Sequence, residues 1–579
     1  MGAVLGWAWA FTLPGLLLSA LSVGRRPGAA SQGGPIAMFV LAAAWLLGDR
    51  RPFELRLDGW LPFLPTSAFH VRVDALSVLM LAIVGAVATC VYVFSLGYMD
   101  DPEYSDRDVR RFFCFLDIFV ATMAILVLAG NIAVLLVGWT GVGLSSFLLI
   151  SFRRKLPYSL GAGLQALAAN AIGDAALLLA VVVVPAGCGD LLTLGSAACV
   201  ALPGGAALIA WLVFIAAAAK SAQGPLYFWL PTAMAGPTPV SALIHAATMV
   251  AAGVYLLVRT HALLEAAPSV ALVAAWVGTI TALAAGAASC VQTNFKRGLA
   301  YSTVSQLGYM FAAAGLLAPF AAIFHLLTHA SYKALLFLTA GMVIHAKHGH
   351  EELADLRGLR KVLPGAHLAF LVGSLALVGV PGSAGALSKD AILDAAQEHN
   401  MALAICLLVG AGLTGLYAGR LFFGVFYGPP ADGHDVHAPS PLMSWPLVPL
   451  AIGAVVLGYL EWPSGALSGV LGDTVGHPEH LNFASMIGLF AAVLGIAGFA
   501  LSPWFFANSY SKRGEAGSTD SWVVATASLG GALAARLAGA HSGRLGSYAM
   551  ASILGIVALV AVGVVTMYAG VVVNMGVRP

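Results

Sequence analysis

The sequence predicts an all-α integral membrane protein, and three observations carry that prediction. The chain of 579 residues is 60% hydrophobic and only 9% charged, whereas soluble proteins carry about 25% charged residues. Its mean hydropathy is +0.90. Apolar runs of about 20 residues, the length of a membrane-spanning helix, recur along most of the chain. A net charge of +2 gives no support to nucleic-acid binding.

We expect about sixteen membrane helices. They cover residues 3–22, 35–48, 76–97, 112–130, 132–151, 159–184, 205–224, 238–262, 270–292, 298–317, 319–345, 364–396, 400–427, 441–461, 482–507 and 549–574. No small-residue cleavage site follows the first run, so it reads as a retained helix rather than a signal peptide. The second is short, and the twelfth is interrupted near Pro381 and Gly382.

The positive charges predict the orientation of these helices. With the N-terminus outside, 18 of the 28 Lys and Arg residues fall in cytoplasmic loops, 6 on the outer side and 4 inside helices. Because cytoplasmic loops carry an excess of Lys and Arg, we expect both termini on the outer side. The four intramembrane cations are Lys220, Lys333, Lys389 and Arg420.

The stretch from Lys220 to Met249 carries the strongest functional pattern. It places a lysine in an apolar segment, interrupts that segment with four prolines, and places His245 in the next apolar run. A charge at bilayer depth costs roughly 2.5–3.5 kcal/mol, so it marks a functional group by default. A broken helix is tolerated only where it is buried in protein or lines a wet cavity. We therefore expect Lys220 to belong to an ion or proton path.

Lys389 lies beside the second interruption, five helices after Lys220. Corresponding broken helices in two halves of a membrane protein indicate an inverted repeat with sites near the midplane. We therefore divide the chain into N-terminal helices (1–111), two five-helix units with broken helices 7 and 12 (112–262 and 263–427), and a C-terminal part (428–579).

A third pattern lies between the two interruptions, in the segment HLLTHASYK. Its residues His325, His329 and Lys333 are spaced i, i+4 and i+8, which places them on one helix face. A pair of structural histidines with an outward-reaching lysine is one interpretation. A zinc site is less favoured, because the pair lacks a third ligand. We favour a proton relay, because histidine titrates near neutral pH.

Further polar residues extend this line through the expected helices. Asp174 lies in the sixth helix, and Asp390 adjoins Lys389 in the twelfth. The tenth helix contributes Tyr301, Ser302, Ser305, Gln306 and Tyr309. A lone polar residue in a membrane helix usually forms a hydrogen bond that holds two helices together. Acids, histidines and lysines in successive helices instead favour a relay.

The six cysteines are scattered without a CxxC pair, so we expect no iron–sulfur or zinc site in this chain. Cys188 and Cys199 share one loop, and we expect two free thiols there rather than a disulfide. Near the C-terminus, residues 509–547 turn polar and glycine-rich around a mostly apolar stretch at 522–537. We expect a short interfacial helix there; a loop packed on partner subunits is the alternative.

Several motifs resemble the antiporter-like subunits L of bacterial complex I, the NADH–quinone oxidoreductase, within the wider Mrp antiporter-related superfamily. The resemblance runs from about residue 70 to 395 and more loosely to the end. The segments that carry it are GYM (97–99), GWTGVGLSSFLL (138–149), KSAQGPLYFWLPTAMAGPTPVSALIHAATM (220–249), KRGLAYSTVSQLGYM (296–310), AIFHLLTHASYKALLFL (322–338), GLRK (358–361) and SKDAIL (388–393).

The resemblance implies a proton-translocating membrane subunit of two inverted five-helix repeats. It implies a central lysine at Lys220, a connecting relay of His245, His325, His329 and Lys333, and an exit-side lysine at Lys389. Asp174 matches the family's helix-six aspartate. It further implies redox-driven partner subunits, including paralogous antiporter-like ones, in a bacterial inner membrane, and no cofactor in this chain itself.

This chain departs from the family pattern at three places. Thr140 stands where the family carries a glutamate, and Ala171 where it commonly carries an arginine. Lys220 therefore lacks its expected counter-ion, which Asp174 can replace; Asp117 adds another acid nearby in sequence. The link at 509–547 limits any lateral helix to about 60 Å. Alternative functions are a membrane subunit of a bicarbonate-concentrating or hydrogenase complex, or an Mrp-type cation/proton antiporter.

Overall fold

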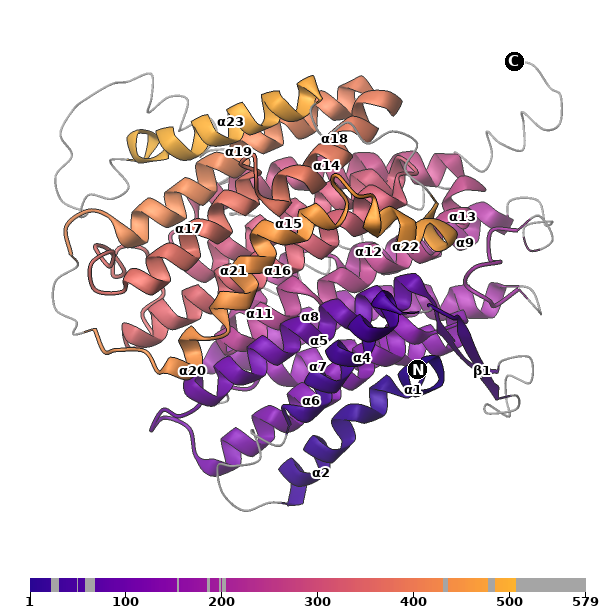
Figure 1. Cartoon of the computed structure of the whole chain (residues 1–579), viewed down its shortest axis with the longest axis horizontal. Coiled ribbons are helices and arrows are strands. Elements are labelled where there is room, and N and C mark those ends of the chain that lie inside the picture. Colours follow the sequence, from indigo (N-terminus) through magenta and orange to yellow (C-terminus); the bar gives the residue numbers. More distant parts are fainter. Residues whose placement is uncertain are drawn as a thin grey trace.

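The computed structural model describes residues 1–21, 31–48, 50–57, 68–153, 156–184, 188–196, 199, 205–430, 436–476 and 485–506. The link expected at 509–547 and the last expected span, 549–574, lie outside these residues. Figure 1 shows the helices crossing the molecule side by side, with β1 near the right-hand end and α20 near the left-hand end. The described chain is therefore a helical bundle with loops gathered at its two ends.

The N-terminal part contains helices and one hairpin. Its elements are α1 (Gly2–Leu5), the 3-10 helix η1 (Ala8–Thr12), α2 (Leu13–Leu21), α4 (Gly33–Leu47), β1 (Phe53–Leu57) and β2 (Phe69–Val73). The expected helix at 3–22 is thus divided into three pieces. The strands pair antiparallel, with Phe53 opposite Val73 and Leu57 opposite Phe69. This hairpin was not predicted from the sequence.

The next helices form the first expected five-helix unit and its flanks. They are α5 (Ala75–Tyr98), α6 (Asp106–Leu128), α7 (Ile132–Ile150), α8 (Pro157–Val183), α9 (Gly205–Lys220), α11 (Thr238–Ala246), α12 (Met249–Arg259) and α13 (His261–Glu265). Between α9 and α11 the chain forms only short pieces: η2 (Leu226–Phe228), α10 (Trp229–Thr232) and η3 (Ala233–Ala235). Side-chain caps begin several of these helices, such as Ser105 before α6 and Asn131 before α7.

The remaining helices cover the second unit and the C-terminal part. They are α14 (Pro268–Val291), α15 (Phe295–Gly315), α16 (Pro319–Ala346), α17 (Pro364–Val378), α18 (Ala384–His399), α19 (Met401–Phe426), α20 (Pro441–Ser444), α21 (Leu447–Val456), η4 (Leu457–Leu460), α22 (Ala466–Val475) and α23 (Met486–Phe505). Each of the first fifteen expected apolar runs overlaps one or more of the helices in the described chain.

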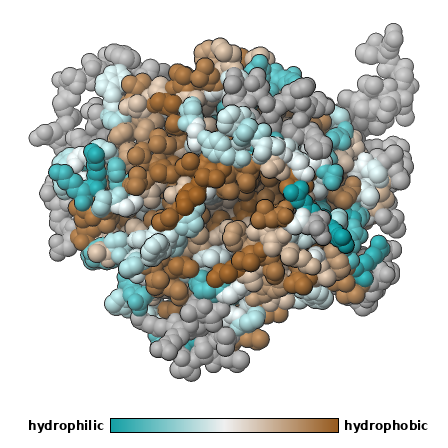
Figure 2. Space-filling model, in the orientation of Figure 1, coloured by the Kyte–Doolittle hydropathy of each residue, from teal (hydrophilic) through white to brown (hydrophobic). Residues whose placement is uncertain are grey.

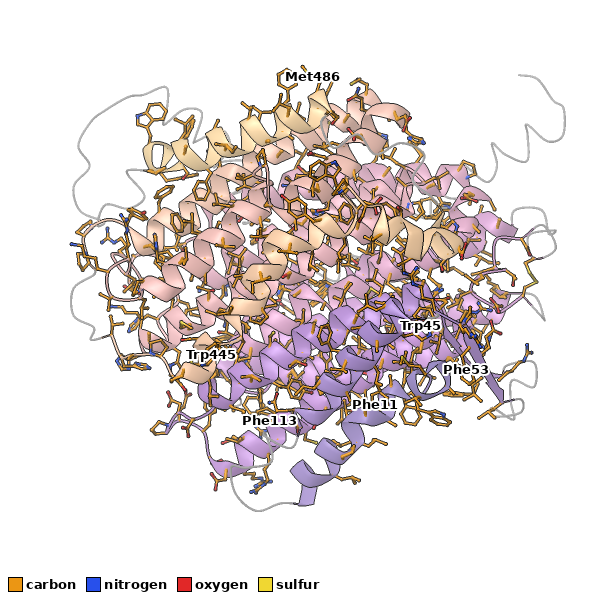
Figure 3. The ribbon with its side chains drawn as sticks, viewed as in Figure 1. Phe11, Trp45, Phe53, Phe113, Trp445 and Met486 are labelled. Atoms are coloured by element: carbon orange, nitrogen blue, oxygen red, sulfur yellow. A yellow bond between two sulfur atoms is a disulfide. The ribbon has the colours of Figure 1, made fainter. Side chains whose placement is uncertain are left out.

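Ten helices of the described chain are long and apolar enough to cross a membrane. Shorter apolar helices, among them α9 and α17, accompany them. Figure 2 shows apolar side chains over a broad band of one face, with polar ones toward its left and right ends. Figure 3 shows Trp445, which is 69% exposed, toward the opposite end of the molecule from Phe53. An exposed indole suits a membrane–water interface.

Both predicted helix interruptions are present. The first spans residues 221–237, and the second lies between α17 and α18, where Gly379 and Gly382 adopt φ of +88° and +90°. Glycine suits these left-handed positions because it has no Cβ. A third break, at Ala247 and Thr248 between α11 and α12, was not predicted.

The expectation of two free thiols at Cys188 and Cys199 is wrong. These cysteines form a disulfide with a Cα–Cα distance of 5.5 Å. The two cysteines are eleven positions apart in the sequence, and their Cα–Cα distance lies in the usual range for a disulfide. That both cysteines share one loop is evident from the sequence, but a shared loop does not fix the direction of their Cβ atoms.

Candidate functional site

The first interruption begins at a buried ion pair. Lys220, the last residue of α9, is fully buried, and its Nζ lies 3.5 Å from Oδ1 of Asp174 on α8. The same amine lies 5.4 Å from the ring centre of Trp139 on α7, a cation–π distance. Asp174 therefore lies within ion-pair distance of Lys220, although neither the amine nor Oδ1 makes a hydrogen bond with the described residues.

Besides Trp139, the α7 residue that faces Lys220 is Gly143, whereas Thr140 does not face it. A Cβ at Gly143 would lie 2.9 Å from the Lys220 amine. Thr140 is exposed, and its hydroxyl donates to the carbonyls of Leu136 and Val137 in its own helix. Asp117, the other acid considered, accepts hydrogen bonds from Tyr92 and Ser31 in the N-terminal bundle. It therefore has partners of its own there.

His245 occupies the last turn of α11, directly before the unpredicted break. It is fully buried, and neither ring nitrogen has a hydrogen-bond partner of normal geometry among the described residues. Its ring packs 4.6 Å from that of Phe337 on α16. A buried imidazole without protein partners is costly, so this position is suited to transient proton exchange or to a bound water.

The three relay residues predicted on α16 are all fully buried. The rings of His325 and His329 lie 6.4 Å apart, and the ring of Tyr332 lies 5.4 Å from His329. Lys333 donates a short hydrogen bond from Nζ to the hydroxyl of Ser302 on α15. The i, i+4, i+8 spacing therefore places the three residues on one face of a helix whose interior is buried in the bundle.

His325 is the centre of a hydrogen-bond network that joins four helices. Its Nδ1 lies 2.9 Å from the Ser388 hydroxyl on α18, and its Nε2 lies 3.3 Å from Gln306 Oε1 on α15. Gln306 in turn donates to the Tyr417 hydroxyl on α19 at 3.2 Å. Because Ser388 precedes Lys389, the network reaches the second interruption through neighbouring residues.

Lys389 lies directly at the second interruption. Its Nζ donates to the carbonyls of Leu377 (2.8 Å) and Val378 (3.1 Å), the last residues of α17. These carbonyls lack helical donors because α17 ends there. Asp390 lies on another face of α18, since a Cβ on Gly488 of α23 would meet its carboxyl group at 2.6–2.8 Å. The structure thus gives neighbouring Lys389 and Asp390 different surroundings.

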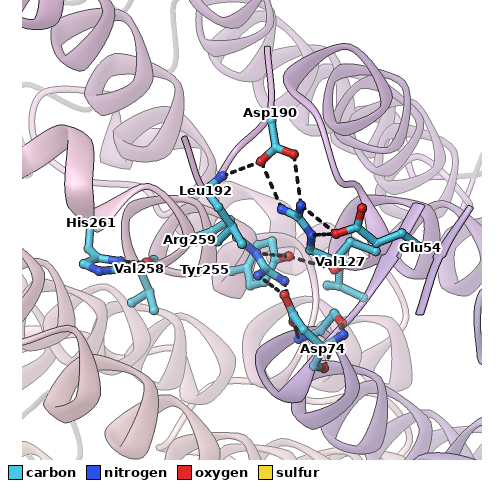
Figure 4. A network of polar contacts seen from close by, with 11 residues as sticks. Glu54, Asp74, Val127, Asp190, Leu192, Tyr255, Val258, Arg259 and His261 are labelled. Carbon is cyan, nitrogen blue, oxygen red and sulfur yellow. Dashed lines mark hydrogen bonds and ion pairs between the residues drawn. The ribbon is translucent and has the colours of Figure 1, made fainter. Parts of the chain in front are cut away.

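Two further cations, beyond the four predicted inside helices, are buried. Lys296 begins α15 and is fully buried; it forms an ion pair with Glu351 at 3.0 Å. Arg259 ends α12 and pairs with Asp74, the N-cap of α5. Figure 4 shows Arg259 between Asp74 and Tyr255, with Asp190 and Glu54 close by. Neither acid partner is near in sequence, so only the fold reveals these pairs.

No group of three or more His, Cys, Asp or Glu side chains in the described part of the chain is placed to hold a metal ion. His325 uses both ring nitrogens in contacts with Ser388 and Gln306. A zinc ligand needs one nitrogen free for the metal, so the hydrogen bonds of His325 favour a relay over a metal site.

Family models match two parts of the chain. The model described as "NADH:quinone oxidoreductase/Mrp antiporter, TM" matches residues 129–414. The model described as "NADH-Ubiquinone oxidoreductase (complex I), chain 5 N-terminus" matches residues 60–113. The two matched ranges contain every proposed relay residue.

Curated relatives are similar over most of the chain. The NADH-quinone oxidoreductase subunit L of Escherichia coli is 42% identical over 452 residues, covering 76% of this chain and 71% of the relative. Its counterpart from Mycobacterium tuberculosis is 41% identical over 451 residues, covering 76% and 70%. The NADH-ubiquinone oxidoreductase chain 5 of Metridium senile is 41% identical over 415 residues, covering 70% and 68%.

Two solved structures share the fold. The Mrp complex from Dietzia sp. matches with a TM-score of 0.75 and 27% identity, covering 100% of this chain and 63% of its counterpart. An archaeal membrane-bound sulfane sulfur reductase matches with a TM-score of 0.72 and 20% identity, covering 85% of this chain and 99% of its counterpart. The second match supports the fold alone.

Proposed function

Because this chain belongs to the family of antiporter-like subunits L of NADH–quinone oxidoreductase, we propose that it moves protons along its buried lysine and histidine side chains. It is a membrane subunit of a proton-translocating oxidoreductase. We assign the electron transfer itself, and any cofactor that it requires, to partner subunits. These partners include a redox module and paralogous antiporter-like subunits.

The polar interior of α16 carries this proposal. His325, His329 and Lys333 are fully buried in a helix that is completely enclosed by the bundle. Intramembrane titratable groups are expensive and are usually functional. His325 and Lys333 contact hydroxyl and amide groups rather than counter-ions, and neither ring nitrogen of His329 has a hydrogen-bond partner of normal geometry among the described residues. A proton can therefore arrive and leave without breaking an ion pair.

We propose that the two interruptions are the proton-handling points of the two five-helix units, 112–262 and 263–427. In the first, Asp174 replaces the family's missing glutamate as the partner of Lys220. A proton can pass between this amine and carboxylate while the pair keeps zero net charge, which limits the cost of burial. In the second, Lys389 acts on the exit side, with Asp390 as a further proton acceptor.

We propose an inner-membrane location with both described ends of the bundle exposed to water and the N-terminus outside. The Cys188–Cys199 disulfide supports this orientation. It lies in the loop after α8, which the distribution of positive charges predicts to be outside, and disulfides persist in oxidising compartments such as the periplasm.

Proton flux through the whole complex tests the proposed path. In vesicles that carry the assembled complex, Lys333→Met should lower the number of protons moved per NADH oxidised, while NADH oxidation in the presence of an uncoupler continues. Lys361→Met, which removes an exposed lysine after α16, is the matched control and should leave the ratio unchanged. An unchanged ratio in Lys333→Met vesicles would show that the α16 path carries no protons.

The full-length match to the Mrp complex favours one second candidate, cation/proton exchange. The same vesicles separate the two. Proton uptake that is independent of sodium supports pumping alone, whereas sodium movement opposite to the protons, lost in Lys333→Met, would assign exchange to this chain.

A further inference from the structure

Lys296 is a buried lysine that the proposed proton path does not use. It occupies the first turn of α15 and has no exposed surface. Its Nζ donates to the carbonyls of Met234 (2.7 Å) and Gly236 (3.1 Å) and to Glu351 Oε1 (3.0 Å). All three donor positions of the ammonium group are therefore occupied, two of them by backbone.

The two carbonyls belong to the end of the first interruption. Met234 lies in η3, and Gly236 is the residue that follows η3, two positions before α11 begins at Thr238. The prolines at 237 and 239 have no N–H group, so this turn of chain is short of backbone donors. A buried carbonyl without a donor costs about 1–3 kcal/mol. Lys296 supplies the missing donors from another helix.

The second interruption is held in the same way. There Lys389 donates to two carbonyls at the end of α17. In the first interruption Lys220 has a carboxylate partner instead, and Lys296 makes the contacts to the carbonyls. At the second interruption, Lys389 both handles protons in the proposed path and contacts the carbonyls. At the first interruption, Lys220 has the first of these roles and Lys296 the second.

Glu351 connects this contact to the segment after α16. The amide of Phe295 donates to the Glu351 carbonyl (2.8 Å), and Asn294 donates to Glu351 Oε2 (3.1 Å). The amide of Leu353 donates to the Thr293 carbonyl (2.9 Å). Although burial opposes it, the charge of Lys296 and the side-chain hydrogen bonds from Asn294 and Lys296 hold the pKa of Glu351 below its ordinary value. The carboxylate is therefore charged at neutral pH.

Helix α15 also contacts the relay residues of α16. Further along it, Ser302 accepts from Lys333 and Gln306 contacts His325. A single helix therefore contacts the turn that leads into His245 at one end and the α16 relay in its middle.

We propose that Lys296 is a positioning residue that fixes the Met234–Gly236 turn on α15, and so sets the register of α11 and His245 against the α16 relay. It holds the geometry of the path and does not itself carry protons. This inference rests on the proposed function, because it assumes that protons pass between His245 and α16.

The test compares four variants of the assembled complex in vesicles. Lys296→Met removes the donor to both carbonyls and should lower the protons moved per NADH oxidised, normalised to assembled complex. Arg297→Met removes the same charge from the exposed neighbouring position and should have no effect. Glu351→Gln leaves both carbonyl contacts of Lys296 in place and should keep most of the proton flux. The double variant Lys296→Met/Glu351→Gln should be as impaired as Lys296→Met.

The double variant makes this test specific. If it recovers normal flux, or if Glu351→Gln alone loses as much as Lys296→Met, Lys296 only neutralises Glu351 and the positioning role is wrong. Lys333→Met, measured alongside, separates the two proposals. Flux lost in Lys333→Met but intact in Lys296→Met overturns the positioning role alone, whereas flux intact in both overturns the path.

Discussion

At the scale of single residues, the buried cations differ in what they bind. Lys220 pairs with Asp174 and Arg259 with Asp74, so each brings a negative charge into the bundle with it. Lys333 and Lys389 donate only to neutral oxygens in the described contacts. When such a lysine gives up its proton, no carboxylate is left unpaired. Lys333 and Lys389 can therefore lose or gain a proton without changing the partner of a carboxylate, whereas Lys220 and Arg259 are each paired with an acid.

Gly143 offers a test of the Lys220–Asp174 pair that leaves both charges in place. In Gly143→Ala the added methyl group would lie 2.9 Å from the Lys220 amine, closer than normal contact. The amine must shift, and we expect fewer protons moved per NADH oxidised. Gly161→Ala on α8 is the control, because a Cβ there meets nothing within 4 Å; helix propensity predicts a gain of up to about 1 kcal/mol. Equal flux in both variants would remove Gly143 from the site.

Residue chemistry made part of this site predictable from the sequence. Burying a titratable side chain in the membrane costs free energy, so such residues indicate a functional site. The lysines beside prolines or glycines, and the spacing of His325, His329 and Lys333, could therefore be identified from the sequence. Lys296 was missed because it stands beside the exposed Arg297 at a helix start and looks like a loop charge. Its partners are two backbone carbonyls and an acid 55 residues away, and no local pattern encodes them.

At the scale of helices, interruptions are predictable where proline or glycine causes them. The breaks at 221–237 and at Gly379–Gly382 follow from these residues. The break at Ala247 and Thr248 has neither. It is stabilised by Thr248, whose hydroxyl donates to the Leu243 carbonyl at 2.7 Å. Because a single threonine hardly changes the hydropathy of the segment, a break that depends on its hydroxyl cannot be predicted from the hydropathy pattern.

The Thr248 hydroxyl should therefore matter more than its size suggests. The Leu243 carbonyl otherwise receives only a long 3.4 Å contact from the Ala247 amide. Thr248→Val should cost about 1–3 kcal/mol, the penalty of an unsatisfied buried acceptor. In the control Thr260→Val, the Leu256 carbonyl keeps its 3.0 Å bond from the Thr260 amide, so a smaller loss is expected. Thermal unfolding of the assembled complex measures both, and equal losses would contradict the special role of Thr248.

The β1–β2 hairpin should loosen in acid. Arg72 on β2 binds both carboxylate oxygens of Asp190, at 3.0 and 2.9 Å. Although burial opposes it, hydrogen bonding from Arg72 and the Leu192 amide lowers the pKa of Asp190. Its contribution to stability is therefore complete above the ordinary Asp pKa of about 3.9 and is lost as the pH falls through the lowered value.

Hydrogen exchange of the hairpin amides, corrected for intrinsic rates, measures this change. Protection should fall between pH 5 and the most acidic pH that the complex tolerates (about 3). Asp190→Asn should show weaker protection already at neutral pH and little further loss in acid. The same acid-dependent loss in Asp190→Asn would assign it to another group.

At the scale of the whole molecule, the two most buried spans are not the most apolar ones. The spans Thr238–Arg259 and Pro319–Ala346 are completely buried, and the second is the least apolar of the ten candidates. Peripheral spans such as Met486–Phe505 are more apolar and less buried. The hydrophobic effect does not drive one helix against another inside lipid, so packing and polar contacts select the centre. Hydropathy therefore predicted the spans but not which of them forms the core.

The orientation of the bundle in the membrane can be tested by a reagent that reaches only one side. If the loop after α8 faces the periplasm, a membrane-impermeant maleimide should label Cys188 and Cys199 in intact cells only after mild reduction. Cys114 and Cys406, which are partly exposed, are replaced by serine to remove competing thiols. In that background, Arg107→Cys, at an exposed position in the first turn of α6, should be labelled only after the cells are permeabilised. Three helices, α6, α7 and α8, lie between Arg107 and the loop that holds Cys188 and Cys199, so the two positions are expected on opposite sides of the membrane. Labelling of Arg107→Cys in intact cells in which Cys188 and Cys199 stay unlabelled would reverse the orientation. It would also place the exit-side Lys389 on the path of proton entry.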